Sequence, residues 1–405
     1  MNEMHIFKHL LNEFPNDNEI AEIAQRINKS FDETRQHVTE MFSNLQITQQ
    51  GIIDNINTNN FTLFPDNRIS IGNYGKNEEM SDYFLCHYKA DLLCDYSIEE
   101  MAIVTGFGPS NAPTAGTLSM IFRTIELQKK TGIYTHIIIP DLGFMNVRTT
   151  DLQNIINTTE HFIRFIQALG FDFNNGIIRT HNSIDLYRTF TIATSSLTLT
   201  DFVSNKEATQ DLYHSLKLQG NDYSTLIHNT LCASDILLPI LKDKKKLVLV
   251  ISGVEEFYFT SLAQIVIDSL KQKSGSMAGF VNHDPQICSI FGRLIEGLFP
   301  YVKMSKSIPE SSISLGDNEK VIRNKIINCG KRNEFVLFDM IMLASNWDKS
   351  EKEKVKRAYN EYFSTGDNST WLTYKEKYAD FFINIKQLWE SLSVEKINVY
   401  TNIYS

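Results

Sequence analysis

The sequence lacks any long uninterrupted apolar run, which excludes an ordinary transmembrane span. Its 405 residues are 42% hydrophobic and 21% charged, as in a soluble globular protein. The first residues, MNEMHIFKHLLNEF, mix charged and apolar side chains too closely for the apolar core of a secretory signal. We therefore expect a cytoplasmic protein that does not enter a membrane.

Cysteines are few and no two of them have the C-x-x-C spacing. The chain has an odd number, and they are scattered: Cys86, Cys94, Cys232, Cys288 and Cys329. A disulfide framework or a structural zinc site requires paired or clustered cysteines. We expect free thiols and no metal site built from protein ligands.

The chain also has no excess of basic residues: acidic residues outnumber them, and the net charge is -9. Residues 1–100 hold seven Lys and Arg against 17 Asp and Glu, so the rest of the chain is nearly neutral. This excludes the strongly basic surface typical of many nucleic-acid-binding proteins. One local basic run, KDKKK at 242–246, could bind a polyanion, but a solvated loop before a strand is the preferred interpretation.

The chain shows no internal repeat, and its N-terminal region predicts helices. Residues 18–46 carry apolar side chains at helical spacing, interrupted at NKS. A helix-turn-helix with Arg35, Gln36 and His37 as base readers is one interpretation. The acidic balance favours an ordinary helical hairpin. Residues 50–80 are rich in Asn, Gly and Asp, and predict loops or short strands.

From about residue 100, short β-branched runs alternate with longer helical stretches, which predicts a doubly wound, Rossmann-type α/β fold with a parallel sheet. The runs are MAIVTGF, THIIIPDL, GIIRTH and KLVLVISG. Beyond SISLGD only helical periodicity remains. We therefore divide the chain into an N-terminal, mainly helical extension (1–98), a catalytic domain (99–316) with a helical insertion at about 184–238, and a C-terminal helical domain (317–405).

The first strand of this region runs into TGFGPSNAPTAGTLSM, a turn that leads into a helix. The free N–H groups of a helix N-terminus favour anions, and Gly116 would let a base or phosphate approach the backbone. Glycine-rich turns of this kind also occur for purely structural reasons, so both interpretations stay open.

The segment YVKMSKSIPE holds Lys303 and Lys306 three positions apart in a small, polar stretch. Two ammonium groups on flexible stems could neutralise a polyphosphate while a loop closes over it and later opens to release product. A solvated basic loop is the alternative, but the word KMSKS is specific.

With these two motifs the sequence resembles the class I aminoacyl-tRNA synthetases, and within them the tryptophanyl type. TGFGPSNAPTAGT is similar to the HIGH-type turn, and KMSKSIPESSISLGD to the KMSKS loop. YSTLIHNTLCASDILL and VISGVEE are similar to the side-chain pocket and the ribose motif. The order and spacing of the four segments agree over roughly residues 99–330.

The resemblance implies roles for particular residues. It places Lys303, Lys306, Thr114 and Thr117 at the reaction centre. Asp235, with Cys232 and Val104, would form the amino acid pocket, and Asp235 would accept the indole N–H. The implied ATP contacts are Gly108, Pro109, Ser110, Gly116, Thr117, Gly253, Glu255, Lys303, Met304, Ser305, Lys306 and Ser307.

Some positions differ from the family pattern. Thr117 stands where the turn ends in His or Asn, and Glu255-Glu256 stands in place of D-Q. Cys232 replaces a pocket Met, Gly143 a His that commonly follows Asp141, and Ile308 an acid.

The resemblance implies a ligase that activates an amino acid, tryptophan being favoured, with ATP and transfers it to tRNA. Mg²⁺ would accompany the nucleotide, and the insertion would supply a homodimer interface. Two alternatives stay open: a paralogue that transfers the activated amino acid to another acceptor, and a pseudo-synthetase that senses amino acid or nucleotide.

Overall fold

The computed structural model describes residues 14–58, 60–64, 69–71, 74, 77–109, 111–148, 151–213, 216, 218–273, 284–293, 295–298, 304 and 309–392. Contacts divide the chain into two compact units, each assembled from separate stretches of sequence. One comprises residues 1–46, 111–123 and 294–393, and the other residues 47–110, 124–293 and 394–405. The three consecutive regions expected from the sequence remain a proposal about functional parts.

The second unit contains a seven-stranded sheet in the order β1-β2-β7-β6-β3-β4-β5. Its strands are β1 (Thr62–Leu63), β2 (Phe84–Tyr88), β3 (Met101–Gly106), β4 (Tyr134–Ile139), β5 (Gly176–Thr180), β6 (Leu247–Ser252) and β7 (Gln286–Gly292). The five strands from β7 to β5 are parallel, and β1 and β2 extend the β7 edge in antiparallel pairing. The four predicted strand runs are confirmed. Strand β1 lies in residues 50–80, where loops or short strands were expected, whereas β2 and β7 were not predicted.

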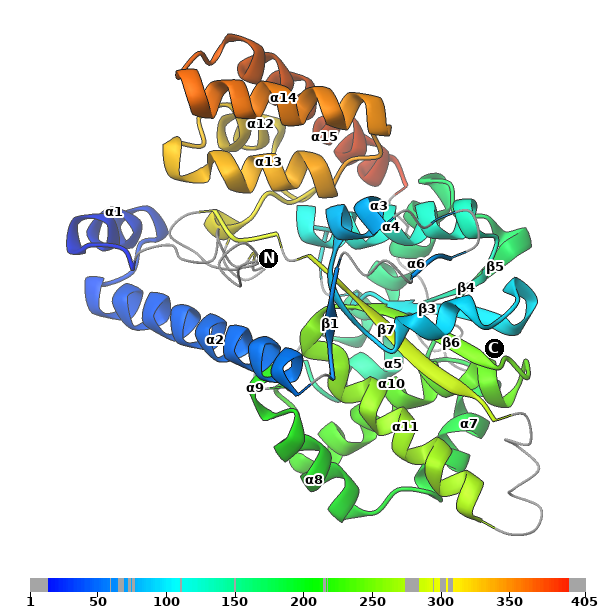
Figure 1. Cartoon of the computed structure of the whole chain (residues 1–405). Coiled ribbons are helices and arrows are strands. Elements are labelled where there is room, and N and C mark those ends of the chain that lie inside the picture. Colours follow the sequence, from blue (N-terminus) through cyan, green and yellow to red (C-terminus); the bar gives the residue numbers. More distant parts are fainter. Residues whose placement is uncertain are drawn as a thin grey trace. The chain divides into compact units, whose positions relative to one another are not determined.

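The strand order reverses at β3, and this makes the fold doubly wound. From β3 the chain proceeds to β4 and β5 on one side, and later to β6 and β7 on the other. Because such crossovers share one handedness, the reversal puts the connecting helices on opposite faces. Figure 1 shows α6 (Leu152–Ala168) on one face, and α10 (Asp222–Leu241) and α11 (Phe257–Gln272) on the other. Every residue of β6 is buried, as expected for a strand covered on both faces.

Further helices surround the sheet of this unit. They are α3 (Asn77–Tyr83), α5 (Asp141–Phe144), α7 (Ile184–Thr194), α8 (Leu199–Ala208) and α9 (Gln210–Tyr213). Within the predicted insertion at 184–238, the described residues are mainly helical. Helix α10 has the length and composition of a membrane span, but 67% of its apolar window is buried within the protein, as in a core helix.

The first unit is helical in the residues that the structure describes, apart from connecting segments. It holds α1 (Asp17–Ile27), α12 (Glu319–Ile327), α13 (Glu334–Leu343), α14 (Lys349–Thr365) and α15 (Ser369–Ser391), with parts of α2 (Phe31–Asn57) and α4 (Ala115–Thr131). Trp371, Tyr378 and Phe382 on α15 are fully buried. The predicted C-terminal helices are confirmed.

The predicted N-terminal helices are also confirmed, with a left-handed Asn28 (φ 54°) ending α1. Helix α2 differs from the prediction because it continues to Asn57, into a stretch expected to be loop. Ile52 lies on this extension and is 4% exposed. Burial of such side chains stabilises a helix although the surrounding Asn and Asp residues disfavour one.

Candidate functional site

A cavity of about 240 Å³ opens at the carboxyl ends of β3, β4 and β6, where the strand order reverses. Open α/β sheets bind ligands at such a switch point. Its apolar walls include Val104, Ile138, Phe144, Ile236 and Phe259. A few polar side chains also line it: Arg148, His228, Asp235 and Glu256. Apolar walls with a few polar groups are typical of small-molecule sites.

Gly108 shapes the wall that follows β3. A Cβ atom at this position would lie 2.8 Å from Cε2 of Phe144, closer than real contacts allow. The glycine therefore lets the aromatic ring of α5 pack against the turn. Both residues line the cavity, so this part of the glycine-rich turn has a packing function.

Asp235 is the buried carboxylate of the cavity, on the central part of α10 and 6% exposed. Arg179, at the end of β5, brings Nη1 to 3.4 Å from its Oδ1 and donates from Nη2 to its backbone oxygen at 3.2 Å. His181 Nε2 lies 2.8 Å from Oδ2. A carboxylate only accepts hydrogen bonds, so the His181 proton is on Nε2.

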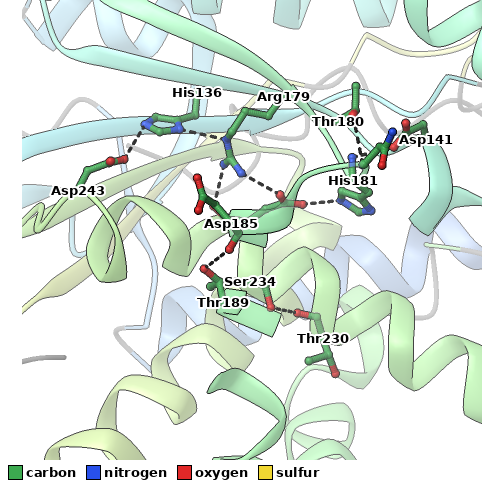
Figure 2. Close-up of polar contacts among 12 residues, drawn as sticks. His136, Asp141, Arg179, Thr180, His181, Asp185, Thr189, Thr230, Ser234 and Asp243 are labelled. Atoms are coloured by element: carbon green, nitrogen blue, oxygen red, sulfur yellow. Dashed lines mark hydrogen bonds and ion pairs between the residues drawn. The ribbon is translucent and has the colours of Figure 1, made fainter. Parts of the chain in front are cut away.

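His181 is itself held in a fixed place (Figure 2). Its backbone N–H donates to Asp141 Oδ1 at 2.7 Å, and the residue is fully buried. A Cβ atom on Gly143 would lie 2.0 Å from His181 Nδ1. The imidazole thus occupies the space that any side chain at position 143 would need. Burial raises the pKa of Asp141, and the nearby His181 and backbone N–H groups oppose this shift.

A second histidine continues the polar chain away from Asp235. Arg179 Nε donates to Nδ1 of His136 at 3.2 Å, and His136 Nε2 points to Asp243, 3.8 Å from its Oδ2 (Figure 2). Burial, and then the charge of Arg179, lower the pKa of His136 to about 3. This imidazole is therefore neutral and accepts from Arg179.

His228 and Cys232 form a neutral pair one turn apart on α10. Nδ1 of His228 lies 3.2 Å from the Gly143 carbonyl oxygen, which can only accept, so this nitrogen carries the proton. Its Nε2 lies 3.5 Å from the Cys232 sulfur and accepts from the thiol. Burial lowers the pKa of His228 to about 4 and raises that of Cys232 well above its usual value.

Opposite charges line another part of the cavity. The Arg148 guanidinium lies 5.7 Å from the Phe144 ring centre, and Nη1 donates to the Val147 carbonyl at 3.4 Å. Glu256 Oε2 accepts from the Gly253 N–H at 3.3 Å.

Gly253 also makes room for the neighbouring Glu255. A Cβ atom on Gly253 would lie 2.5 Å from Glu255 Oε2, so a larger residue at position 253 would collide with the Glu255 side chain.

The remainder of the glycine-rich turn belongs to the first unit. Thr114 and Ser314 form a β-bridge, the Ala115 N–H donates to Ile313 O at 3.0 Å, and the Leu315 N–H donates to Pro113 O at 2.9 Å. The start of α4 is therefore fastened to the segment that follows the lysine motif.

Within this turn, the hydroxyl oxygens of Thr114 and Thr117 lie 3.4 Å apart. A Cβ atom on Gly116 would meet only Thr114 Oγ1, at 3.7 Å.

The lysine motif itself is only partly described. Lys303, Ser305, Lys306 and Ser307 lie outside the described residues, as does Ser110, and Met304 is half-buried. A hydrogen bond of 2.8 Å from Leu298 N–H to Ser311 O closes the base of this segment. The predicted roles of the lysines remain predictions.

Other predicted surfaces have partners within the chain. In the basic run, Lys242 binds Asp185 at 2.6 Å, and Lys246 binds Glu100 at 2.5 Å. Lys245 donates to the backbone oxygen of Glu99. Arg35 of the N-terminal hairpin pairs with Asp17 at 3.1 Å. These contacts agree with a solvated loop and an ordinary helical hairpin.

The structure brings Asp235, Cys232, Val104 and Gly108 together around one cavity. The roles that the resemblance implies for these residues remain predictions. Four polar residues at or behind the cavity were not predicted from the sequence: Arg148, Arg179, His181 and His228. Arg179 and His181 stand in the quoted run GIIRTH, at the end of a predicted strand. Side chains at strand ends are placed to reach a switch-point ligand or its supports, and that rule would have singled them out.

The fold and cavity together define an α/β protein with a cavity at the switch point of its sheet, the place where such folds bind small ligands. The model of the family "tRNA synthetases class I (W and Y)" matches residues 97–355. The chain therefore belongs to this class I synthetase family, and its catalytic fold is the one that the sequence predicted. The family implies the use of ATP, an amino acid and tRNA.

Solved structures agree in fold. The tryptophanyl-tRNA synthetase of Aeropyrum pernix K1 is 19% identical with a TM-score of 0.59, and the match covers 78% of this chain and 87% of that one. The enzyme of Encephalitozoon cuniculi bound to tryptophan is 19% identical with a TM-score of 0.57, covering 79% and 88%. The tryptophanyl-tRNA synthetase of Giardia lamblia is 19% identical with a TM-score of 0.55, and the match covers 79% of this chain and 86% of that one. These likenesses show the fold alone, and no curated protein sequence matches the chain.

Proposed function

We propose that this protein activates an aromatic amino acid with ATP, tryptophan being favoured, and transfers it to tRNA. The observation that supports the proposal best is a buried carboxylate, Asp235, in the wall of a largely apolar cavity at the switch point. Such a cavity suits a flat apolar side chain that has one hydrogen-bond donor. Arg148 and Glu256 add both signs of charge, which suits a zwitterion.

The proposed chemistry requires no covalent nucleophile. The amino acid carboxylate attacks the α-phosphorus of ATP, the bond to pyrophosphate breaks, and an aminoacyl-adenylate forms. Positioning and charge stabilisation dominate such reactions. Lys303 and Lys306 would stabilise the leaving pyrophosphate, and the Thr114–Thr117 turn would bind the phosphates. The high pKa of Cys232 fits this scheme, because the thiol in the cavity stays protonated.

Gly108, Pro109, Ser110, Gly116, Gly253 and Glu255 complete the proposed ATP site. In the described parts of the chain, no three His, Cys, Asp or Glu residues group closely enough to hold a metal ion. We propose that Mg²⁺ is bound by the phosphate oxygens of ATP.

ATP–pyrophosphate exchange with each of the twenty amino acids tests activation. Exchange that depends on tryptophan supports the proposal, whereas binding of an amino acid without exchange supports the sensing pseudo-synthetase. Lys303→Ala and Lys306→Ala should each lower exchange by about 10²-fold or more. Lys354→Ala is the matched control, since this lysine is exposed on α14 and should leave the rate unchanged.

Charging of total tRNA separates the two enzymatic alternatives. Exchange together with charging supports a tRNA ligase, and exchange without charging supports the paralogue with another acceptor. In the first case we propose that the C-terminal helices bind the anticodon arm and that the protein works in the cytoplasm.

We also propose a homodimer formed through the helical insertion. Several of its apolar side chains are exposed: Ile184 (70%), Tyr187 (44%), Leu199 (72%), Val203 (56%) and Tyr223 (74%). Contiguous exposed apolar patches commonly mark an interface, and these side chains are the candidates for one here. Light scattering should give a dimer for the wild type and a monomer for Leu199→Asp. A wild-type monomer at micromolar concentration would contradict the proposal.

A further inference from the structure

The segment that follows the lysine motif is held by a lysine of the next helix. Lys325, on α12, donates from Nζ to the Ser312 backbone oxygen at 2.8 Å and to Asp317 Oδ2 at 2.9 Å. The same carboxylate oxygen accepts from the Ser314 N–H at 3.2 Å. The lysine and aspartate side chains are 17% and 15% exposed. One ammonium group therefore binds both ends of residues 312–317.

The same segment pairs with the start of α4. Ser314 forms a β-bridge with Thr114, and its hydroxyl donates to the Pro113 oxygen at 3.4 Å. The Ala115 N–H donates to the oxygen of Ile313, a fully buried residue, at 3.0 Å. The segment that the ammonium group binds is therefore also the one that supports the start of α4.

The base of the lysine motif is bonded to the beginning of this stretch. The Leu298 N–H donates to the oxygen of Ser311, which is fully buried. Lys303 and Lys306 lie between these two residues in the sequence. Both proposed phosphate-binding elements, the threonine turn and the lysine motif, are thus joined to one short segment. The described residues that make these contacts all belong to the first unit.

A segment of this kind needs support from outside itself. Residues 312–317 belong to no helix, so side-chain bonds from neighbouring elements help to decide their conformation. Helix α12 is a firm support, because Ile322 and Ile326 are fully buried. The positions of groups that stabilise charge matter in phosphoryl chemistry, since a displacement of about 1 Å can cost about 10²-fold in rate.

We propose that Lys325 and Asp317 are positioning residues for adenylate formation. Their ion pair fixes residues 312–317, and this segment holds the Thr114–Thr117 turn and the base of the lysine motif in place. The inference rests on the proposed function, because it takes those two elements as the phosphate-binding parts. It adds two residues that act on the reaction without touching the substrate.

ATP–pyrophosphate exchange tests the proposal with the amino acid that supports exchange in the wild type. Lys325→Met should lower kcat by about 10- to 100-fold. Calorimetric titration with that amino acid should still give one site per chain and an affinity within about twofold, because every residue that lines the cavity belongs to the second unit. An unchanged kcat would overturn the inference, and so would a matching loss of amino acid sites, which indicates unfolding.

Two further variants show whether the ammonium group at this position is responsible. Lys320→Met is the matched control, because this lysine is exposed on the same helix and its variant should keep the wild-type rate. Lys325→Arg should be at least about threefold faster than Lys325→Met, since a guanidinium can still donate to both oxygens. An arginine variant as slow as the methionine variant would overturn the inference.

Asp317→Asn/Lys325→Met guards against loss of the fold, because it leaves no carboxylate without its counter-charge. Both side chains act through one ion pair, so the double variant should be at most about twofold slower than Lys325→Met. Losses that multiply would mean that the two residues act independently, and would overturn the inference.

Hydrogen exchange followed by mass spectrometry tests the structural step. In Lys325→Met, peptides that contain Ser314 and Leu315 should exchange at least about tenfold faster than in the wild type, whereas peptides of α10 should be unchanged. Equal exchange of the first peptides in both proteins would overturn the inference. Faster exchange throughout the chain would also overturn it, because the lysine would then stabilise the fold as a whole.

Failure of the inference differs from failure of the proposed function. A wild type that shows no exchange with any amino acid would remove both. A wild type that exchanges, together with a Lys325→Met variant of equal rate, would remove the positioning role and leave amino acid activation standing.

Discussion

Gly143 and His181 lie so close together that only a glycine fits at position 143. The imidazole that binds Asp235 lies where a Cβ atom of residue 143 would be, 2.0 Å from Nδ1. The glycine is therefore required by packing, although it is not in a left-handed conformation.

Gly143→Ala should displace His181 and lower the free energy of unfolding by about 1–3 kcal/mol, the usual cost of overpacking a buried site. Urea unfolding measures the change. Gly116→Ala is the control, because its Cβ would make only an ordinary 3.7 Å contact in a helix, and it should be neutral or slightly stabilising. Equal stability of Gly143→Ala and the wild type would contradict the packing described here.

Cys232 should be an unreactive thiol although His228 is its neighbour. Burial raises the pKa of Cys232 well above its usual value and lowers that of His228 to about 4, so the thiolate–imidazolium pair does not form near neutral pH. Iodoacetamide labelling followed by mass spectrometry should modify the exposed Cys94 at least about tenfold faster than Cys232. Faster labelling of Cys232 would instead indicate an activated thiol.

At the scale of elements, helix α10 shows why one segment carries so much of the site. It presents His228, Cys232, Asp235 and Ile236 to the cavity at intervals of one turn or less. The helix is buried along most of its length, so its side chains are fixed on several sides. A precise pocket requires such rigid support.

The C-terminal helices contain a buried ion pair of their own. Lys375 of α15 binds Glu334 of α13 at 2.9 Å, and the Trp371 indole N–H donates to the same carboxylate at 2.7 Å. Lys375 is 2% exposed and Glu334 8%. The pair fastens two helices that the sequence separates by a whole helix, α14.

Lys375→Met should lower the free energy of unfolding of this helical part by about 3–5 kcal/mol, because it leaves a buried carboxylate without its counter-charge. Glu334→Gln/Lys375→Met should recover much of the loss, since a neutral amide can still accept from Trp371. Thermal unfolding followed by tryptophan fluorescence compares the three proteins. A double variant that is less stable than the single one would contradict this account.

At the scale of the whole molecule, stability should depend on pH through Glu296. This side chain is 3% exposed, and burial, followed by the charge of Asp339, raises its carboxyl pKa from 4.5 to about 9. The folded protein therefore holds a proton that the unfolded chain releases above pH 4.5. The stabilisation from this proton is complete below that pH and is lost progressively as the pH rises towards 9.

Glu296→Gln keeps the shape of the side chain and removes its titration. Relative to this variant, the wild type should lose stability between pH 5 and pH 8, by at most about 1.4 kcal/mol per pH unit. Urea unfolding at several pH values measures the difference. Two stability curves that stay parallel over this range would show that Glu296 does not titrate there.

The fold was largely predictable because its signals are local. A β-branched run such as MAIVTGF predicts a buried strand from its own residues, and β3 covers Met101–Gly106. Helix α2 is longer than predicted, because burial of Ile52 stabilises the helix more than the low helix propensity of the neighbouring Asn and Asp residues destabilises it. Strand β2 was missed because its pairing with β7 joins residues about 200 positions apart, whereas β1 pairs with β2 and lies in a stretch where loops or short strands were expected.

The sequence by itself determined the family, the parallel sheet and the candidate residues Asp235, Lys303 and Lys306. Short motifs and periodic patterns of apolar residues are properties of consecutive residues, so they can be recognised without a structure. Only the tertiary structure decided what stands behind Asp235. Arg179 and His181 lie more than 50 residues from it in the chain and reach it because β5 ends beside α10. Their role depends on burial and distance, and no linear pattern contains either quantity.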